Sequence, residues 1–212
     1  MTTLTKPAKL TKADEAIKQR IMEEARDLFF RFGFSKVTMD ETAESVGMSK
    51  KTLYRFFSRK EDLLEEITRT HLEECNQEIA AIIGKSGMDP LEKLRKFLNY
   101  VTAIYAKMSG ALLHDLRRNV PEIWKMVEDH RQNCMQNEFC ALIKEGRQKG
   151  RFRKDVDERL FVLIYSQVMK EILNPDVLSG LPFKPEQVFD SVVKVLFEGM
   201  LTDKARTEYH AK

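Results

Sequence analysis

The sequence has 212 residues, of which 42% are apolar and 33% charged, as in an ordinary globular protein. Glycine and proline number only 9 and 6, which argues against a fibrous, disordered or all-β chain. The longest apolar run, from Leu160 to Tyr165, is far shorter than the roughly 20 residues that span a bilayer. Met1 to Leu10 lack the apolar stretch of a secretory signal, so we expect a cytoplasmic protein without membrane partners.

The charge is distributed unevenly along the chain. The first 60 residues hold 13 Lys and Arg against 8 Asp and Glu, whereas the remainder holds 23 against 25. A basic N-terminal part on a mildly acidic body indicates an anionic partner for that part.

The three cysteines, Cys75, Cys134 and Cys140, are odd in number and include no C-x-x-C pair. A disulfide framework and a structural zinc site are therefore not expected. His114 and His130 lack the spacing of an HxxxH or HExxH pair. We expect reduced thiols, no bound metal and no cofactor.

Helical periodicity begins at Lys12, after a flexible arm over residues 1–11, and continues to Gly33. Two short helices are predicted next. Thr38 and Glu41 form a capping box for a helix to about Val46, and Ser49 caps a second helix over residues 50–56.

The rest of the chain also shows helical patterns, with no evident strand or internal repeat. Ser58 and Glu61 form a further capping box that predicts a long helix through Ile79. The later helices are expected at about residues 90–105, 121–149, 156–173 and 185–201, with a less regular segment at 109–118 and a loop at 174–185.

Two short helices joined by a tight turn at Gly47 have the geometry of a helix-turn-helix. Leu53 and Phe57 face inward from the second helix. Its outward positions are Lys50, Lys51, Thr52, Tyr54 and Arg55. Five basic residues and no acidic one lie between Lys50 and Lys60, which suits a phosphate-lined major groove.

Many positions at fixed spacing then form one extended pattern. They are Ile21, Ala25, Leu28-Phe29, Gly33-Phe34, Val37-Thr38-Met39, Ala43, Val46-Gly47-Met48-Ser49, Thr52-Leu53-Tyr54, Phe57, Lys60-Glu61 and Leu63. This pattern resembles the DNA-binding domain of TetR-family transcriptional regulators over roughly residues 15–64, under a third of the chain. Thr42, Lys51 and Phe56 depart from residues that the family often carries there.

The resemblance implies an all-α fold of about nine helices. A helix-turn-helix DNA-binding domain of three helices would cover residues 12–60, and a larger helical domain for ligand binding and dimerisation would cover 61–212. It also implies roles for individual residues. Thr38, Lys36 and Lys60 would hold phosphates, Tyr54 would reach the DNA backbone, and Ser49, Lys50, Lys51, Thr52 and Arg55 would form the recognition surface.

The body would enclose a pocket for an apolar or amphipathic effector and would pair with a second copy. The pocket candidates are Tyr100, Tyr105, Met108, His114, Trp124, Met126, Met135 and Phe139. The two C-terminal helices would form the homodimer, with Phe161, Tyr165, Met169, Val192, Val195, Leu196 and Gly199 as interface candidates.

The leading hypothesis is a homodimeric repressor that leaves a palindromic double-stranded DNA operator when a small-molecule effector binds. A DNA-binding activator of the same fold and a helical protein-interaction adaptor that does not read DNA are the alternatives. No HExxH, GxSxG or P-loop motif indicates an enzyme.

Overall fold

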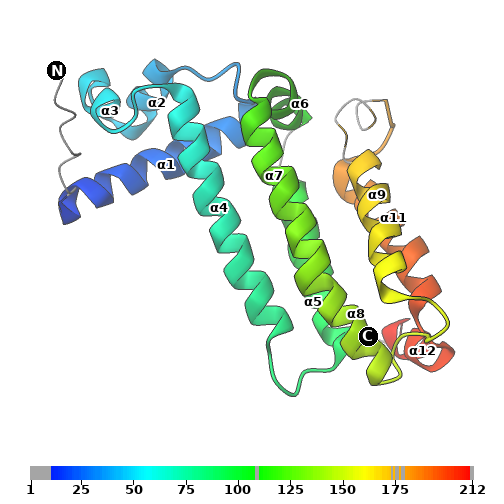
Figure 1. Ribbon diagram of the computed structural model, residues 1–212. Coiled ribbons are helices and arrows are strands. Elements are labelled where there is room, and N and C mark those ends of the chain that lie inside the picture. Colours follow the sequence, from blue (N-terminus) through cyan, green and yellow to red (C-terminus); the bar gives the residue numbers. More distant parts are fainter. Residues whose placement is uncertain (1–10, 108–109, 173, 175–176, 178–179, 211–212) are drawn as a thin grey trace, which may run out of the picture.

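The computed structural model describes residues 11–107, 110–172, 174, 177 and 180–210. Within these residues the regular secondary structure is helical, apart from one isolated antiparallel bridge between Phe152 and Leu201. The first three helices lie across the top of a helical body, and a later pair of helices flanks that body (Figure 1). None of the helices described there is long and apolar enough to cross a membrane.

The N-terminal helices are α1 (Lys12–Phe32), α2 (Met39–Val46) and α3 (Lys50–Phe56). The caps predicted for α2 and α3 are confirmed. Thr38 and Glu41 cap each other's backbone amides, and the Ser49 hydroxyl accepts from the amide of Thr52. Gly47 ends α2 in the left-handed region at φ 71°, a conformation that costs a side-chain-bearing residue about 1 kcal/mol or more.

The capping box predicted at Ser58 and Glu61 is wrong. Helix α4 (Lys60–Ile83) begins after Arg59, which makes no side-chain cap. The Ser58 hydroxyl instead donates to the Asp62 carboxylate at 2.7 Å, and Arg59 pairs with that carboxylate at 2.6 Å. The hydroxyl is thus turned to a side chain that lies one helical turn further on.

The body contains α5 (Pro90–Lys107), α6 (Gly110–Asn119), α7 (Pro121–Cys134) and α8 (Cys140–Gln148). The less regular segment expected at 109–118 is in fact the regular helix α6 from Gly110 onward. The single helix expected over 121–149 is interrupted by one π-helical turn, η1 (Met135–Phe139), which joins α7 to α8.

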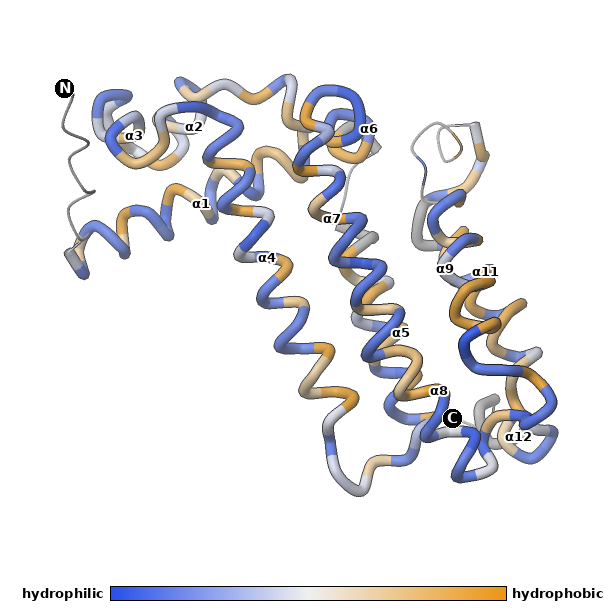
Figure 2. Tube along the Cα trace, in the orientation of Figure 1, coloured by the Kyte–Doolittle hydropathy of each residue, from blue (hydrophilic) through white to orange (hydrophobic). Residues whose placement is uncertain are grey.

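Three further helices are bounded within the described residues after α8. They are α9 (Glu158–Ile172), α11 (Pro185–Met200) and α12 (Asp203–His210). The sequence did not predict α12. It is separated from α11 because Leu201 is extended and pairs with Phe152. Hydrophobic residues run along both α9 and α11 (Figure 2).

The buried apolar residues form two clusters, one under the N-terminal helices and one in the body. The N-terminal cluster is not confined to α1–α4. Leu112 and Leu116 of α6, together with Val120 and Ile123, belong to it. Trp124 packs against both clusters. Helix α6 and the start of α7 therefore connect the N-terminal helices to the body through shared packing.

Candidate DNA-binding surface and ligand cavity

The packing between α2 and α3 fixes the direction of the exposed face of α3. Ala43, Val46 and Leu53 are buried between the two helices. The Arg20 guanidinium of α1 donates to the carbonyl of Val46 at 2.5 Å, next to the turn at Gly47. Leu53 therefore points inward, Thr52 and Phe56 are half-buried, and the other positions of α3 point outward.

The outward face of α3 is basic, as predicted. Lys50, Lys51, Tyr54 and Arg55 are exposed. Lys50 pairs with Asp40 at 2.5 Å, and Arg55 pairs with Asp14 at 2.7 Å. Exposed pairs of this kind contribute about 1 kcal/mol or less, so a phosphate can replace either carboxylate. Lys51 forms no ion pair within the described residues, so a phosphate can bind it without displacing a carboxylate.

The hydroxyls predicted at the helix starts are engaged as caps. Thr38 donates to the Glu41 carboxylate at 2.8 Å, and a hydrogen bond from the Thr38 backbone amide holds the pKa of Glu41 below its ordinary value. Ser49 and Thr52 share a hydrogen bond of 2.9 Å. All these groups lie at the start of α2 or α3, where backbone amides favour a phosphate. Lys36 is exposed just before α2.

Lys60 is partly buried, and its ammonium donates to the carbonyls of Phe34 at 2.8 Å and Val37 at 2.9 Å. It also lies over the Phe34 ring, 4.1 Å from the centroid. Burial lowers the pKa of Lys60. A lysine ammonium has three donors, so one donor remains for a phosphate after the two carbonyls are bound. Through its hydrogen bonds to the two carbonyls, Lys60 holds the α1–α2 loop against the start of α4.

The same loop is held from the other side by Asp115 of α6. Asp115 is 9% exposed, and its carboxylate accepts from both the backbone amide and the hydroxyl of Ser35, each at 2.7 Å. Asn119 donates to the Ser35 hydroxyl oxygen at 2.8 Å and to Asp115 at 3.0 Å. We call Ser35, Asp115 and Asn119 the loop–α6 junction. It fixes the position of the α1–α2 loop, and of helix α2 that follows it, relative to α6.

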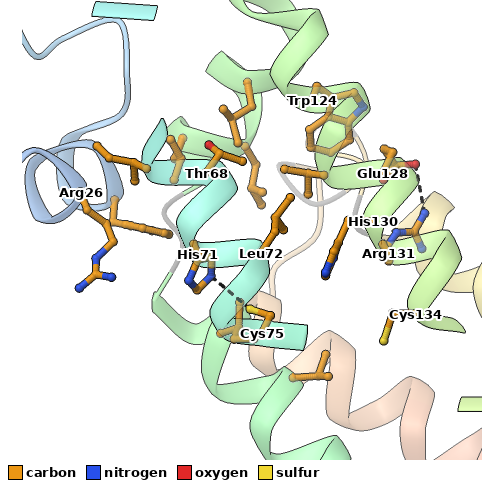
Figure 3. A pocket seen from close by; sticks show the side chains of 18 of the residues that line it. Arg26, Thr68, His71, Leu72, Cys75, Trp124, Glu128, His130, Arg131 and Cys134 are labelled. Atoms are coloured by element: carbon orange, nitrogen blue, oxygen red, sulfur yellow. Dashed lines mark hydrogen bonds and ion pairs between the residues drawn. The ribbon is translucent and has the colours of Figure 1, made fainter. Parts of the chain in front are cut away.

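A cavity of about 150 Å³ lies beneath this junction, between α1, α4, α5, α6 and α7. Side chains of α4 and α7 face each other across it (Figure 3). Apolar and weakly polar side chains form most of its wall. They include Phe29, Phe30, Ile67, Leu72, Cys75, Phe97, Val101, Leu112, Leu113, Leu116, Trp124, Val127, Cys134 and Met135.

Arg26, which also lines the cavity, pairs with Glu74 at 3.7 Å, and the other polar groups at the cavity carry little net charge. Burial lowers the pKa of His71 and of His130, and it raises the pKa of Cys134 to about 11. The imidazoles and the thiol are therefore neutral at pH 7. Arg131 pairs with Glu128 at 3.1 Å, as the dashed line in Figure 3 marks. Such a wall suits an apolar group.

The predicted pocket residues do not all reach this cavity. Trp124 and Met135 line it. Tyr100 lines an adjoining hollow beside α1, and Met126 lines one between α4 and α7. Phe139 is fully buried in the body core, and His114 is exposed, so neither borders the cavity. The side chain of Tyr105 and the whole of Met108 lie outside the described residues.

Some of the predicted interface residues are buried in the core, and others are exposed. Phe161, Tyr165, Met169 and Val192 are at most 8% exposed because they pack in the protomer's own core, which removes them from a surface role. Val195 is 75% exposed, Gly199 is exposed and Leu196 is half-buried. The exposed apolar residues of α9 are instead Leu160, Leu163 and Ile164.

Sequence reasoning missed the residues that α1 and α4 contribute to the cavity, together with the junction at Asp115. The one sequence signal for them is that three polar residues, Thr68, His71 and Cys75, lie on one side of α4 at helical spacing, among apolar residues. Within the described residues no three His, Cys, Asp or Glu side chains gather as a metal site requires.

Comparison with known proteins agrees with this architecture. Residues 21–67 match the family model for bacterial regulatory proteins of the tetR family. The chain is 28% identical to the uncharacterized HTH-type transcriptional regulator YvaF of Bacillus subtilis, covering 88% of this chain and 96% of that protein. It is 24% identical to the HTH-type transcriptional repressor KstR2 of Mycolicibacterium smegmatis, covering 86% and 90%. A TetR-family regulator from Agrobacterium tumefaciens shares the fold, with a TM-score of 0.69, 18% identity and coverage of 89% and 99%.

Proposed function

The chain belongs to the TetR family of transcriptional regulators, and we propose that it is a homodimeric repressor that an effector releases from a palindromic operator. Like its relatives, it is a regulator rather than an enzyme. The observation that carries the proposal is that α6 contributes both to the wall of the apolar cavity and to the packing of the DNA-binding helices.

The basic face of α3 supports the DNA-binding part of this proposal. Lys50, Lys51 and Arg55 project from one short helix whose opposite side is fixed by Leu53. In a helix-turn-helix protein such a helix enters the major groove, and its first residues meet base edges. Lys36, Thr38 and Lys60 flank it and would hold the adjacent phosphates, which position the protein without reading sequence.

The exposed apolar residues of α9 and α11 support the dimer. Leu160 and Leu163 are each 54% exposed, Ile164 is 44% exposed and Val195 is 75% exposed. Several large apolar side chains exposed on two neighbouring helices indicate an interaction surface. We propose that these four residues, with Leu196 and Gly199, meet the same surface of a second copy around a two-fold axis.

The loop–α6 junction supports the coupling between effector and DNA. Leu112 and Leu116 line the cavity, and Asp115 lies between them on the same helix and binds Ser35. An effector that requires a different position of α6 would therefore move the α1–α2 loop and the helices that follow it. It would do so only to the extent that it binds one arrangement more tightly than the other.

Replacing Asp115 by asparagine should weaken this junction. Asparagine offers one carbonyl oxygen in place of two carboxylate oxygens, so its NH2 group would face one of the two Ser35 donors. We expect a loss of about 1–3 kcal/mol in the free energy of unfolding, measured in urea at fixed protein concentration, together with weaker operator binding. Asp190→Asn, at an exposed position of α11, is the matched control. A wild-type unfolding midpoint for Asp115→Asn would contradict the assigned role.

Selection of bound sequences from randomised duplex DNA, at two salt concentrations, tests the proposed function. We expect an enriched palindromic motif and an affinity that falls steeply with salt, because phosphate contacts release counterions. Binding without any enriched motif would contradict a sequence-reading regulator. An enriched motif without two-fold symmetry would contradict the dimer.

A further inference from the structure

A further hollow, of about 480 Å³, lies between α9 and the segment formed by α7 and η1, and Leu163 of the proposed dimer surface forms part of its edge. We call it the α7–α9 groove. Its polar lining consists of cations, amides and one hydroxyl, and no Asp or Glu is among its described lining residues. These polar residues are Arg131, Arg159, Lys170, Gln132, Gln136, Gln167 and Ser166.

Two of the three cations in the groove are free to bind a ligand. Arg131 is held by Glu128 at 3.1 Å and by the carbonyl of Ser166 at 3.3 Å. Arg159 and Lys170 are exposed, and neither forms an ion pair within the described part of the chain. They lie about three turns apart on the same face of α9. The groove therefore offers positive charge that no protein carboxylate neutralises.

The groove adjoins the apolar cavity, since Arg131 and Met135 line both. Met135 is the first residue of the π-helical turn η1 and is buried, whereas Gln136, the next residue, is exposed in the groove. A π-helical turn is rare and often marks a functional site. Here it lies where the neutral, apolar wall meets the basic groove.

We infer that the effector is an amphipathic anion whose apolar group occupies the cavity and whose carboxylate or phosphate lies in the α7–α9 groove, where the charges of Arg159 and Lys170 attract it from the two ends of the groove. This inference rests on the proposed function in that it takes the cavity as the effector site. The cavity is close in volume to engineered apolar cavities that bind benzene, so the apolar group that it accepts without rearrangement is about as large as a phenyl ring.

Two probes that differ in charge alone test the inference on the full chain. 4-Phenylbutyrate carries a carboxylate where 4-phenylbutan-1-ol carries a hydroxyl. Trp124 is the sole tryptophan and lines the cavity, so its fluorescence reports binding. We expect the carboxylate to bind at least tenfold more tightly than the alcohol. The double variant Arg159→Gln, Lys170→Gln should lose this preference and keep the affinity for the alcohol.

The matched control is Lys144→Gln, Lys194→Gln, which removes two exposed charges outside the groove and should keep the preference. Equal affinities for the two probes, binding of neither probe, or a preference that survives the Arg159/Lys170 variant would overturn the inference. So would a variant that changes from dimer to monomer in sedimentation, because a second copy would then cover the groove. Carboxylate binding by a protein that selects no DNA motif would refute the proposed function and leave the inference standing.

Discussion

Replacing both Lys50 and Lys51 by alanine is expected to weaken operator binding by roughly 30- to 700-fold. A dimer carries four copies of these charges, and each lost contact to DNA costs about 0.5–1 kcal/mol at an exposed site. The plot of log affinity against log salt should also become less steep by about four, one for each lost cation. Quantitative binding to the selected duplex at several salt concentrations measures both effects.

The fold should survive this change because neither lysine supports the core. Lys51 forms no ion pair among the described residues, and the exposed pair of Lys50 with Asp40 contributes little to stability. Lys85→Ala, Lys144→Ala is the control, since both residues are exposed in the body. If the Lys50/Lys51 variant bound the operator as tightly as this control, α3 would not be the recognition helix.

Glutamate at both Ile164 and Val195 is expected to give a monomer and to lower operator affinity by roughly 1000-fold or more. Each glutamate would place an unpaired charge in the proposed apolar interface, at a cost of several kcal/mol. A monomer contacts a single half-site, and specific binding then falls toward the non-specific level. Sedimentation measures the oligomeric state, and the same duplex measures affinity.

Lys204→Glu serves as the control because it adds negative charge at an exposed position of α12, away from these two residues. The protein must also remain folded, which its helical circular dichroism reports. A folded Ile164/Val195 variant that remained a dimer would show that another surface joins the two copies.

The helix-turn-helix was predictable because its signals are local. The Thr38 and Ser49 caps and the glycine at φ 71° each act within four residues of chain. The capping box expected at Ser58 failed because Asp62 competed for the hydroxyl, and the sequence pattern alone does not rank these two partners. Helix α6 looked irregular in sequence because its apolar residues face both the N-terminal cluster and the cavity.

The cavity and the dimer surface depend on contacts between distant elements, and here residue type was a poor guide. Phe139 attracted attention as a large aromatic residue, yet it fills the body core, whereas Thr68 and Cys75 of α4 border the cavity. Helix α9 is apolar on more than one side. Periodicity therefore did not reveal that Phe161 and Tyr165 pack inward while Leu160 and Ile164 remain exposed.

The most direct test of the central claim, a two-fold dimer that reads successive major grooves, is the half-site spacing of the selected duplex. Two chains per duplex are expected, with half-site centres about 34 Å apart, one helical turn. Inserting five base pairs between the half-sites turns one of them to the opposite side of the DNA and should reduce affinity to that of a single half-site. Unchanged affinity after this insertion, or one chain per duplex, would contradict the account.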